Sequence, residues 1–339
     1  MSLTRLTSML QIEHPLILGP MGGVSGGRLA AAVSSAGALG MVGGGYGDAD
    51  WVDRELSLLR ALTRRPWGIG FITWSLQRQV LLAALEHEPA AVMLSFGDPK
   101  PFVRLIKDAG CRLLCQVQDL SGARRARRAG ADVIVAQGTE AGGHAGSRGT
   151  LALVPAVVDE VSPVPVVAAG GIADGRGLAA ALMLGAQGAL LGTRFYASAE
   201  ALGHARAKAR IVAACGDDTE RTHVFDTVRR LAWPRAFAGR ALGNGFLRRW
   251  RGRDAELALA PPGLRRAYQE AALRGDFDTA VVWAGEAVDL IERVRPAADI
   301  VRDIVREAKA RLRAGHGLER GRGGASQRPL ARDTYRRVS

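Results

Sequence analysis

Residues 132–144, Asp132-Val-Ile-Val-Ala-Gln-Gly-Thr-Glu-Ala-Gly-Gly-His144, join a short apolar run to a glycine-rich loop. The apolar part is typical of a buried strand. The loop glycines let the backbone approach a ligand closely and expose its N–H groups. His144 titrates near neutral pH and can move a proton there. The stretch predicts a strand whose end binds an anionic cofactor beside an acid–base group; the alternative is a glycine-rich turn with a surface histidine.

Similar apolar runs recur along the first 200 residues, separated by Ala-, Leu- and Arg-rich stretches with helical spacing. Helices are expected, for example, at 27–36, 122–129 and 175–184. Several expected helices end in a glycine, as helices commonly do: Gly37, Gly110, Gly130 and Gly185. Because the runs are almost continuously apolar, they suit parallel strands buried on both faces. We expect these strands at 15–20, 39–44, 66–72, 91–96, 112–117, 132–137, 165–169 and 188–195.

Strand–helix units repeated in this way predict an α/β fold, specifically a (β/α)₈ TIM barrel over residues 10–200. The competing fold is a doubly wound open sheet, which usually carries a Gly-x-Gly-x-x-Gly motif after its first strand. That motif occurs nowhere in the chain. In a TIM barrel the functional residues lie at the carboxyl ends of the strands, so the loop that ends in His144 is expected at the active face.

Beyond the eighth strand, residues 198–310 show helical periodicity without a convincing strand. Helices are expected at 199–214, 222–237, 263–273 and 281–311, with a loop at 239–252. We therefore expect a helical subdomain at 201–310, whose last helix packs on the barrel. Residues 311–339 are rich in Gly and Arg, and we expect a basic, disordered tail there.

The chain has 339 residues and a formal net charge of +13, but charge alone does not indicate a nucleic-acid partner. The 311–339 tail carries eight arginines and two acidic residues, and aromatic residues, 5% of the chain, do not alternate with the arginines. We therefore expect no nucleic acid. No apolar run reaches the roughly 18 residues of a membrane span, and no signal peptide is visible. Three cysteines suggest reduced thiols rather than disulfides, so we expect a cytoplasmic protein without membrane contact.

Two further strand ends have the composition of a phosphate site. Gly170 and Gly171 follow the seventh expected strand, and Gly192 and Thr193 follow the eighth. Loops at these two positions form a recurrent phosphate site in TIM barrels, through backbone N–H groups and hydroxyls. The alternative is that both are tight turns required only for packing. Together they favour a phosphate-bearing cofactor.

His144 has no partner of the kind that nucleophilic or metal catalysis requires. The chain has no Gly-x-Ser-x-Gly motif and no second histidine at metal-ligand spacing, so no metal is expected. A lone histidine beside a cofactor suggests proton abstraction or charge stabilisation, with the cofactor performing the harder chemistry. Glu140 is expected to orient the loop or cap a helix.

Several short motifs carry a resemblance to a known family: Pro15-Leu-Ile-Leu-Gly-Pro-Met21, Ala36-Gly-Ala-Leu-Gly40, Gln137-Gly-Thr-Glu-Ala-Gly-Gly-His144, Ala168-Ala-Gly-Gly-Ile172, Leu191-Gly-Thr-Arg-Phe195, Arg240-Ala-Leu-Gly-Asn244, Trp283-Ala-Gly-Glu-Ala-Val288 and Arg295-Pro-Ala-Ala. The chain resembles the nitronate monooxygenases, formerly called 2-nitropropane dioxygenases, over residues 10–310. The resemblance implies an FMN-dependent TIM-barrel oxidoreductase. It would oxidise alkyl nitronates with O₂ to carbonyl compounds and nitrite.

The resemblance also implies which residues form the site. His144 would be the catalytic base or charge-stabilising group over the flavin. The residues that would bind FMN lie at the strand ends: Met21, Gly22, Gly70, Gln116, Gln137, Gly142, Gly143, Gly170, Gly171, Gly192 and Thr193. Two of these depart from the family pattern. Many members have Asn in place of Gly70, and relatives that reduce quinones with NAD(P)H often have Lys near Gln116.

Three functions remain open at this point. The leading one is a nitronate monooxygenase that uses His144, a small-molecule nitronate and O₂. The second is an NAD(P)H-dependent flavin reductase that acts on quinones or enoyl thioesters. The third is a non-catalytic flavin-binding protein that holds an acidic partner through its basic tail. The substrate is expected to be set by the later part of the chain, where Trp233, Phe237 and Phe246 are apolar candidates. A homo-oligomer is possible.

Overall fold

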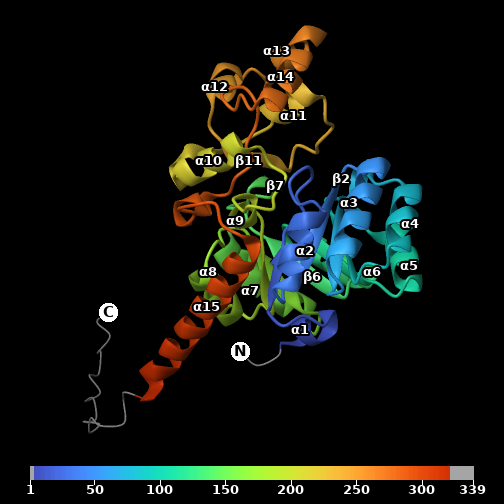
Figure 1. Cartoon of the computed structure of the whole chain (residues 1–339), viewed down its shortest axis with the longest axis vertical. Coiled ribbons are helices and arrows are strands. Elements are labelled where there is room, and N and C mark those ends of the chain that lie inside the picture. Colours follow the sequence, from blue (N-terminus) through green and yellow to red (C-terminus); the bar gives the residue numbers. More distant parts are fainter. Residues whose placement is uncertain (1–3, 321–339) are drawn as a thin grey trace, which may run out of the picture.

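The computed structural model describes residues 4–320, and eight parallel strands form a nearly closed barrel at its centre (Figure 1). The strand order is β1-β9-β8-β6-β5-β4-β3-β2, and a bridge between Ile17 and Leu39 closes the ring. The predicted TIM barrel is confirmed, and the open-sheet alternative is wrong. The strands are β1 (Leu16–Leu18), β2 (Gly40–Gly45), β3 (Trp67–Ile72), β4 (Ala91–Ser95), β5 (Arg112–Val117), β6 (Val133–Gln137), β8 (Val166–Ala169) and β9 (Gly188–Leu191).

The helices that follow the strands surround the barrel and bury their apolar sides against it (Figure 1). Their predicted C-terminal glycines all adopt the left-handed backbone conformation that favours glycine: φ is 86° at Gly37, 74° at Gly110, and 90° at Gly130 and Gly185. These helices are α2 (Gly27–Ser35), α3 (Ala49–Leu62), α4 (Arg78–Glu86), α5 (Lys100–Asp108), α6 (Leu120–Ala129), α7 (Thr150–Val161), α8 (Gly175–Met183) and the four-residue α9 (Thr193–Tyr196), with η1 (Thr73–Ser75) between β3 and α4. Helix α9 occupies the end of the eighth predicted strand.

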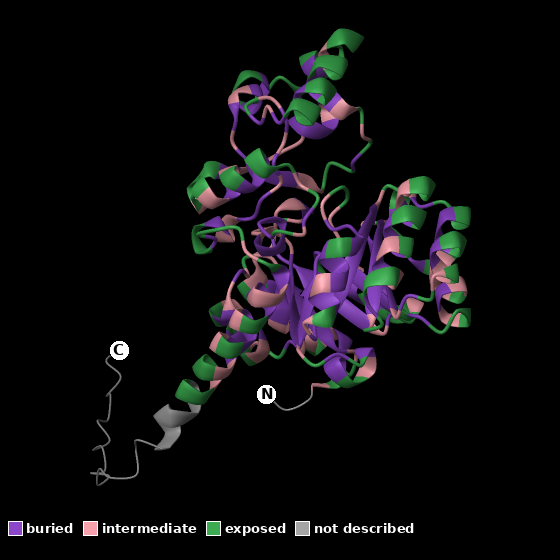
Figure 2. Cartoon of the chain, viewed as in Figure 1, coloured by how far each residue is buried: buried purple, intermediate pink, exposed green. Residues whose placement is uncertain are grey.

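The barrel strands are almost entirely buried (Figure 2), and they contribute to two apolar layers that stabilise the barrel. Strand residues of alternating position, such as Ile17, Met41 and Val135, fill the interior of the barrel. Their neighbours face outward and pack against the helices. Helix α1 (Arg5–Leu10) covers the amino-terminal end of the barrel with Leu6 and Leu10, so the opposite end is the one left for a site.

The segment after the barrel is a mixed lobe rather than a purely helical one. The expectation of no strand in residues 198–310 is wrong, because this segment contains β10 (Thr219–Thr222) and β11 (Ala238–Leu242). Both join β7 (Gly143–Ala145) in a small antiparallel sheet. The predicted loop at 239–252 is also replaced by the end of β11 and a helix. The lobe's helices are α10 (Ala205–Ala213), α11 (Val224–Arg229), α12 (Gly245–Trp250), α13 (Asp254–Ala258) and α14 (Pro262–Arg274), with the 3₁₀ turns η2 (Gly216–Asp218) and η3 (Glu286–Leu290).

The last helix, α15 (Ala297–Arg320), returns to the barrel and packs against α8 and α2. It begins 16 residues later than position 281, where the sequence suggested a start, because residues 281–296 cross the lobe in irregular and 3₁₀ conformation. Residues 311–320 belong to this helix, so the expected disordered tail is wrong for them. The remainder of that tail, 321–339, lies outside the described residues.

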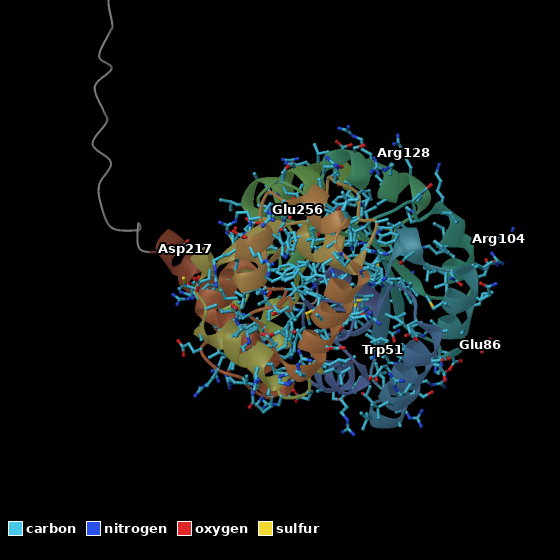
Figure 3. The ribbon with its side chains drawn as sticks, turned by 90° about the horizontal axis from the view of Figure 1, so that it is seen from above. Trp51, Glu86, Arg104, Arg128, Asp217 and Glu256 are labelled. Carbon is cyan, nitrogen blue, oxygen red and sulfur yellow. The ribbon has the colours of Figure 1, made fainter. Side chains whose placement is uncertain are left out.

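Seen from above, the lobe's helices lie in front of the barrel, with Glu256 on the lobe and Trp51, Glu86 and Arg104 on the outer helices (Figure 3). Within residues 4–320, no helix combines the length and apolar character needed to cross a bilayer. The three cysteines are free thiols: Cys111 and Cys115 are buried, and Cys215 is exposed.

The close contact between α8 and α15 predicts that a methyl group added at Gly175 destabilises the protein. A Cβ atom at Gly175 would lie 2.5 Å from the backbone nitrogen of Ala308 and 2.6 Å from the carbonyl oxygen of Ile304. Gly175→Ala should therefore lower the free energy of unfolding by about 1–3 kcal/mol, measured by chemical denaturation. Gly263→Ala is the matched control, because no atom lies within 4 Å of its Cβ position. An equal loss in both variants would contradict this account of the packing.

Candidate active site

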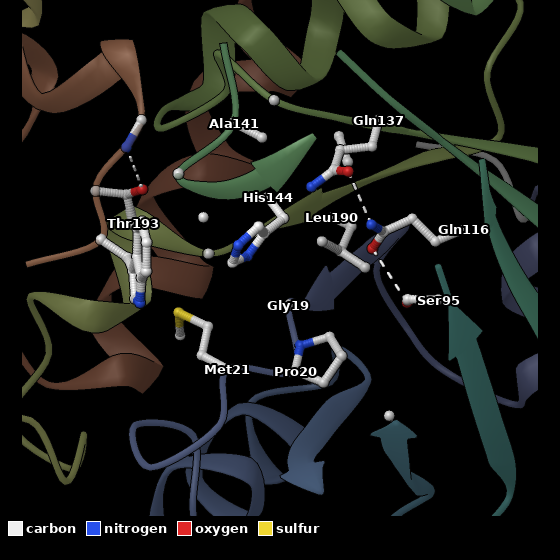
Figure 4. A pocket seen from close by; sticks show the side chains of 18 of the residues that line it. Gly19, Pro20, Met21, Ser95, Gln116, Gln137, Ala141, His144, Leu190 and Thr193 are labelled. Atoms are coloured by element: carbon white, nitrogen blue, oxygen red, sulfur yellow. Dashed lines mark hydrogen bonds between the residues drawn. The ribbon is translucent and has the colours of Figure 1, made fainter. Parts of the chain in front are cut away.

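A cavity of about 260 Å³ opens at the carboxyl ends of the barrel strands, beneath the lobe (Figure 4). All the residues predicted for the site, cofactor-binding and catalytic alike, line it, although they come from six different ends of barrel strands. They are Met21, Gly22, Gly70, Gln116, Gln137, Gly142, Gly143, His144, Gly170, Gly171, Gly192 and Thr193. The structure therefore brings the predicted site residues together in one place.

The side of the cavity over β8 and β9 is formed mainly by backbone. Gly170 and Gly171 have φ values of 96° and 70°, a conformation that side chains rarely adopt. A Cβ atom at Gly170 would also lie 2.9 Å from the carbonyl oxygen of Gly138. Thr193 Oγ1 accepts a hydrogen bond from the Gly285 N–H at 3.0 Å, which leaves its own hydroxyl hydrogen available to a ligand.

A chain of neutral amides lies at the ends of β5 and β6, next to β8. Gln137 Oε1 accepts a hydrogen bond from Gln116 Nε2 at 2.8 Å (Figure 4). It also accepts one from Gln118 Nε2 at 3.0 Å. Ser95 Oγ donates to Gln116 Oε1 at 3.4 Å. Because its oxygen is engaged twice, the Gln137 amide nitrogen is the end of that side chain available to a ligand. Gln118, which the sequence did not single out, therefore helps to orient Gln137.

The loop between β6 and β7 is braced at several points. The Glu140 carboxylate accepts hydrogen bonds from the Thr150 N–H and hydroxyl, both at 2.8 Å, at the first residue of α7. This agrees with the expectation that Glu140 orients the loop and caps a helix. Arg221 donates to the carbonyl oxygens of Thr139 and Ala145, on either side of the glycines. The loop that carries His144 is thus fixed to both the barrel and the lobe.

His144 is buried and paired with Asp226 from α11. Its Nε2 lies 2.8 Å from Asp226 Oδ2, and Asp226 Oδ1 accepts a hydrogen bond from Arg229 Nη2 at 2.9 Å. Only 9% of His144 and 3% of Asp226 are exposed. Burial lowers the pKa of His144 below its ordinary value, while the hydrogen bond and charge of Asp226 raise it in part. The imidazole is therefore held neutral near pH 7, with Nε2 carrying the hydrogen donated to Asp226.

Aromatic rings surround the imidazole. The Trp233 ring lies flat against it, with 3.4 Å between ring centroids and 4° between planes. Trp283 is tilted beside it at 5.3 Å, and Phe96 meets it edge-on at 6.4 Å. These rings exclude water from His144, which is the cause of its lowered pKa.

Part of this site carries no signal of its role in the sequence. Asp226 contacts His144 and Arg229 lines the cavity, but they lie 82 or more positions from His144, and no local pattern marks them. Trp283 begins one of the motifs that carry the resemblance, but no place in the site was predicted for it. Trp233, expected as a substrate contact, lines the cavity. Phe246 does not; it packs in the apolar core of the lobe, where helices α11 and α14 bury it. Phe237 packs against Phe96 rather than lining the cavity.

The fold and cavity define a TIM-barrel enzyme with a glycine-lined ligand site and a buried histidine. A sequence model of the family "Nitronate monooxygenase" matches residues 3–75 and 71–307. A nitronate monooxygenase from Neurospora crassa is 35% identical, with 92% of this chain and 94% of the relative covered. The chain belongs to the nitronate monooxygenase family, and it is an oxidoreductase. This family is one of flavoenzymes.

Two solved structures are similar over almost the whole chain. FabK from Thermotoga maritima superposes with a TM-score of 0.83 and 35% identity, covering 93% of this chain and 99% of its own. A nitroalkane oxidase from Streptomyces ansochromogenes superposes with a TM-score of 0.79 and 30% identity, covering 92% and 99%. The barrel and the lobe are thus shared with both proteins.

The pair formed by His144 and Asp226 predicts how the imidazole titrates. Its pKa should lie below 6.5, and Asp226→Asn should lower it further, because the carboxylate is the group that raises it. The measurement is an NMR titration of the His144 ring, with unfolding temperatures recorded to confirm folding. Asp254→Asn, at an exposed position of helix α13 and not among the charges that act on His144, is the control and should leave the titration unchanged. A rise in the pKa of His144 in Asp226→Asn would contradict the assignment.

Proposed function

We propose that the protein oxidises alkyl nitronates with O₂, giving a carbonyl compound and nitrite, with FMN as its cofactor. The observation that carries this proposal is the buried, neutral His144, held by Asp226 at the edge of a glycine-lined cavity. The family and the similarity to a nitroalkane oxidase support the same chemistry. The substrate is a small molecule that enters beside His144.

The residues of the cavity fit FMN. The glycines over β8 and β9 present backbone to a ligand, and the Thr193 hydroxyl is available to donate, as a phosphate requires. The carboxylate of Glu140, an acidic residue of the lining, accepts hydrogen bonds from the N–H and hydroxyl of Thr150. These bonds turn its charge toward α7, which reduces its repulsion of a phosphate. Gln137, at the end of the neighbouring strand β6, offers amide hydrogens that suit the polar edge of a flavin ring. When bound, FMN would supply the electron transfer that no side chain of the site can perform.

His144 has a defined part in this chemistry. Because Asp226 accepts the hydrogen of Nε2, the other nitrogen, Nδ1, carries the lone pair. Nδ1 can then remove the α-proton of a neutral nitroalkane and so form the nitronate. The protonated imidazole that results is stabilised by Asp226, which already carries the opposite charge.

Arg229 gives the cavity a positive charge near the histidine. Its guanidinium is partly exposed, lines the cavity, and lies 5.3 Å from the centre of the Trp283 ring. Asp226 and the Phe225 carbonyl engage two of its nitrogens. A cation in this place favours the nitronate anion over the neutral nitroalkane.

Replacing the histidine tests its role as a base. In His144→Asn, kcat/KM for neutral 2-nitropropane should fall by roughly 10²–10⁴-fold, the usual contribution of a general base. With preformed propyl-2-nitronate the loss should be much smaller, because the proton has already left. In the unaltered protein, the rate with 2-nitropropane should decline only below pH 6.5, since the base must be neutral and its pKa is lowered. Nitrite formation is the measurement.

The control for this variant is His87→Gln, which removes a histidine that pairs with Asp53 on the outer helices. It should leave both rates unchanged. An equal loss of activity in His144→Asn with nitroalkane and with nitronate would contradict a role in proton removal.

One observation favours a second function, an NAD(P)H-dependent flavin reductase that acts on quinones or enoyl thioesters. FabK from Thermotoga maritima superposes with the higher TM-score of the two solved structures described above. The amide of Gln116, however, leaves the β5 side of the cavity without a cation that would stabilise a reduced, anionic flavin. We therefore place this function second.

Anaerobic spectroscopy separates the two functions. The purified protein should show a flavin spectrum that changes on mixing with propyl-2-nitronate and stays unchanged with NADH or NADPH. Rapid bleaching by a nicotinamide alone would identify the reductase instead. A colourless protein that takes up no FMN would contradict both functions.

A further inference from the structure

The position of Trp233 on the imidazole has a consequence for substrate choice. Trp233 belongs to the connection between α11 and β11, and it lies against one face of the His144 ring at van der Waals distance. Trp283 is beside the same ring. The indole of Trp233 therefore forms a wall of the space that a substrate must enter to reach His144.

Three residues from the ends of neighbouring barrel strands hold this wall in place; we term Tyr46, Trp74 and Phe96 the aromatic socket. Trp233 Nε1 donates a hydrogen bond to the Tyr46 hydroxyl at 2.8 Å. Its ring meets Trp74 edge-on at 5.6 Å and Phe96 at 4.9 Å, with interplanar angles of 82° and 79°. Such edge-to-face pairs are favourable and directional, so the indole has one preferred position.

Phe96 supports this interpretation through its backbone. Its φ of 60° lies in the left-handed region, which is rare for a bulky residue and costs energy. The strain places the Phe96 ring between Trp233 and Phe237, 4.9 Å and 5.2 Å from their ring centres. A strained residue persists only where the surrounding structure requires it. Here the strained Phe96 helps to fix the position of Trp233.

We propose that Trp233, held by the aromatic socket, determines substrate size and limits the site to small nitro compounds. This inference rests on the proposed function. The cavity must hold the cofactor as well as the substrate, and the Trp233 indole occupies the space against one face of the His144 ring. A bulky substrate would have to displace the indole, which breaks its hydrogen bond to Tyr46 and its contacts with Trp74 and Phe96 together.

The test is a series of preformed nitronates of increasing bulk: ethylnitronate, propyl-2-nitronate, cyclohexylnitronate and the nitronate of phenylnitromethane. In the FMN-loaded protein, kcat/KM should fall as bulk increases. In Trp233→Ala, the ratio of kcat/KM for cyclohexylnitronate to that for ethylnitronate should rise about tenfold or more, mainly through KM. Tyr46→Phe, which removes only the hydrogen-bond acceptor of Trp233, should shift the same ratio in the same direction by a smaller factor.

Trp51→Ala is the matched control, because Trp51 lies on the outer helix α3 (Figure 3), and it should leave the ratio unchanged. An unchanged ratio in Trp233→Ala, or an equal loss for every nitronate, would overturn the inference. Turnover of ethylnitronate by the unaltered protein would still support the proposed function in that case. Failure of the unaltered protein to oxidise any nitronate would instead refute the proposed function. Preformed nitronates are used so that loss of proton removal does not enter the comparison.

Discussion

The pairing of β7 with β11 is the interaction on which the site depends. Gly143–Ala145 would otherwise be a loop after β6, but its register with Ala238–Leu242 places His144 opposite Gly239. A side chain at Gly239 would collide with the Trp283 ring, so glycine at this position lets Trp283 lie against the β7–β11 pair. One short ladder thereby joins the barrel to the lobe and brings His144, Asp226 and Trp233 together from distant parts of the chain.

Burial then sets the chemistry of that group. A buried carboxylate is costly unless it is paired, and Asp226 is paired twice, with His144 and with Arg229. Since the arginine shares the carboxylate, Asp226 orients the imidazole without fully compensating the effect of burial on its pKa. The histidine stays neutral, as the base in the proposed function must be, and the proposal assigns the ring nitrogen away from Asp226 to the substrate.

The cavity is divided into two different surfaces. Over β8 and β9 it presents glycine backbone and the hydroxyl of Thr193, which suit a phosphate. Over β2 and β4 it presents Tyr46 and Phe96, with Trp233 above them. The strand order of the barrel places these surfaces on opposite sides, so a cofactor and an apolar substrate group can be held at once without competing for the same contacts.

The sequence by itself predicted the barrel and the residues at the strand ends that line its cavity. Near-continuous apolar strands and glycine helix ends are local patterns, and each strand end lies at the same face of a TIM barrel. This is why Gly170, Thr193 and Gln137 could be named in advance. Their precise roles toward FMN remain a proposal, as does the catalytic role of His144.

Only the tertiary structure decided what surrounds the histidine. Strands β10 and β11 are short and polar in part, and they gain stability from the sheet in which β11 pairs with both β10 and β7, rather than from their own composition. Asp226, Arg229 and Trp233 likewise follow from how α11 and the segment after it pack over the barrel. Such long-range contacts leave no periodic pattern in the chain, because they depend on the meeting of segments about 80 or more residues apart.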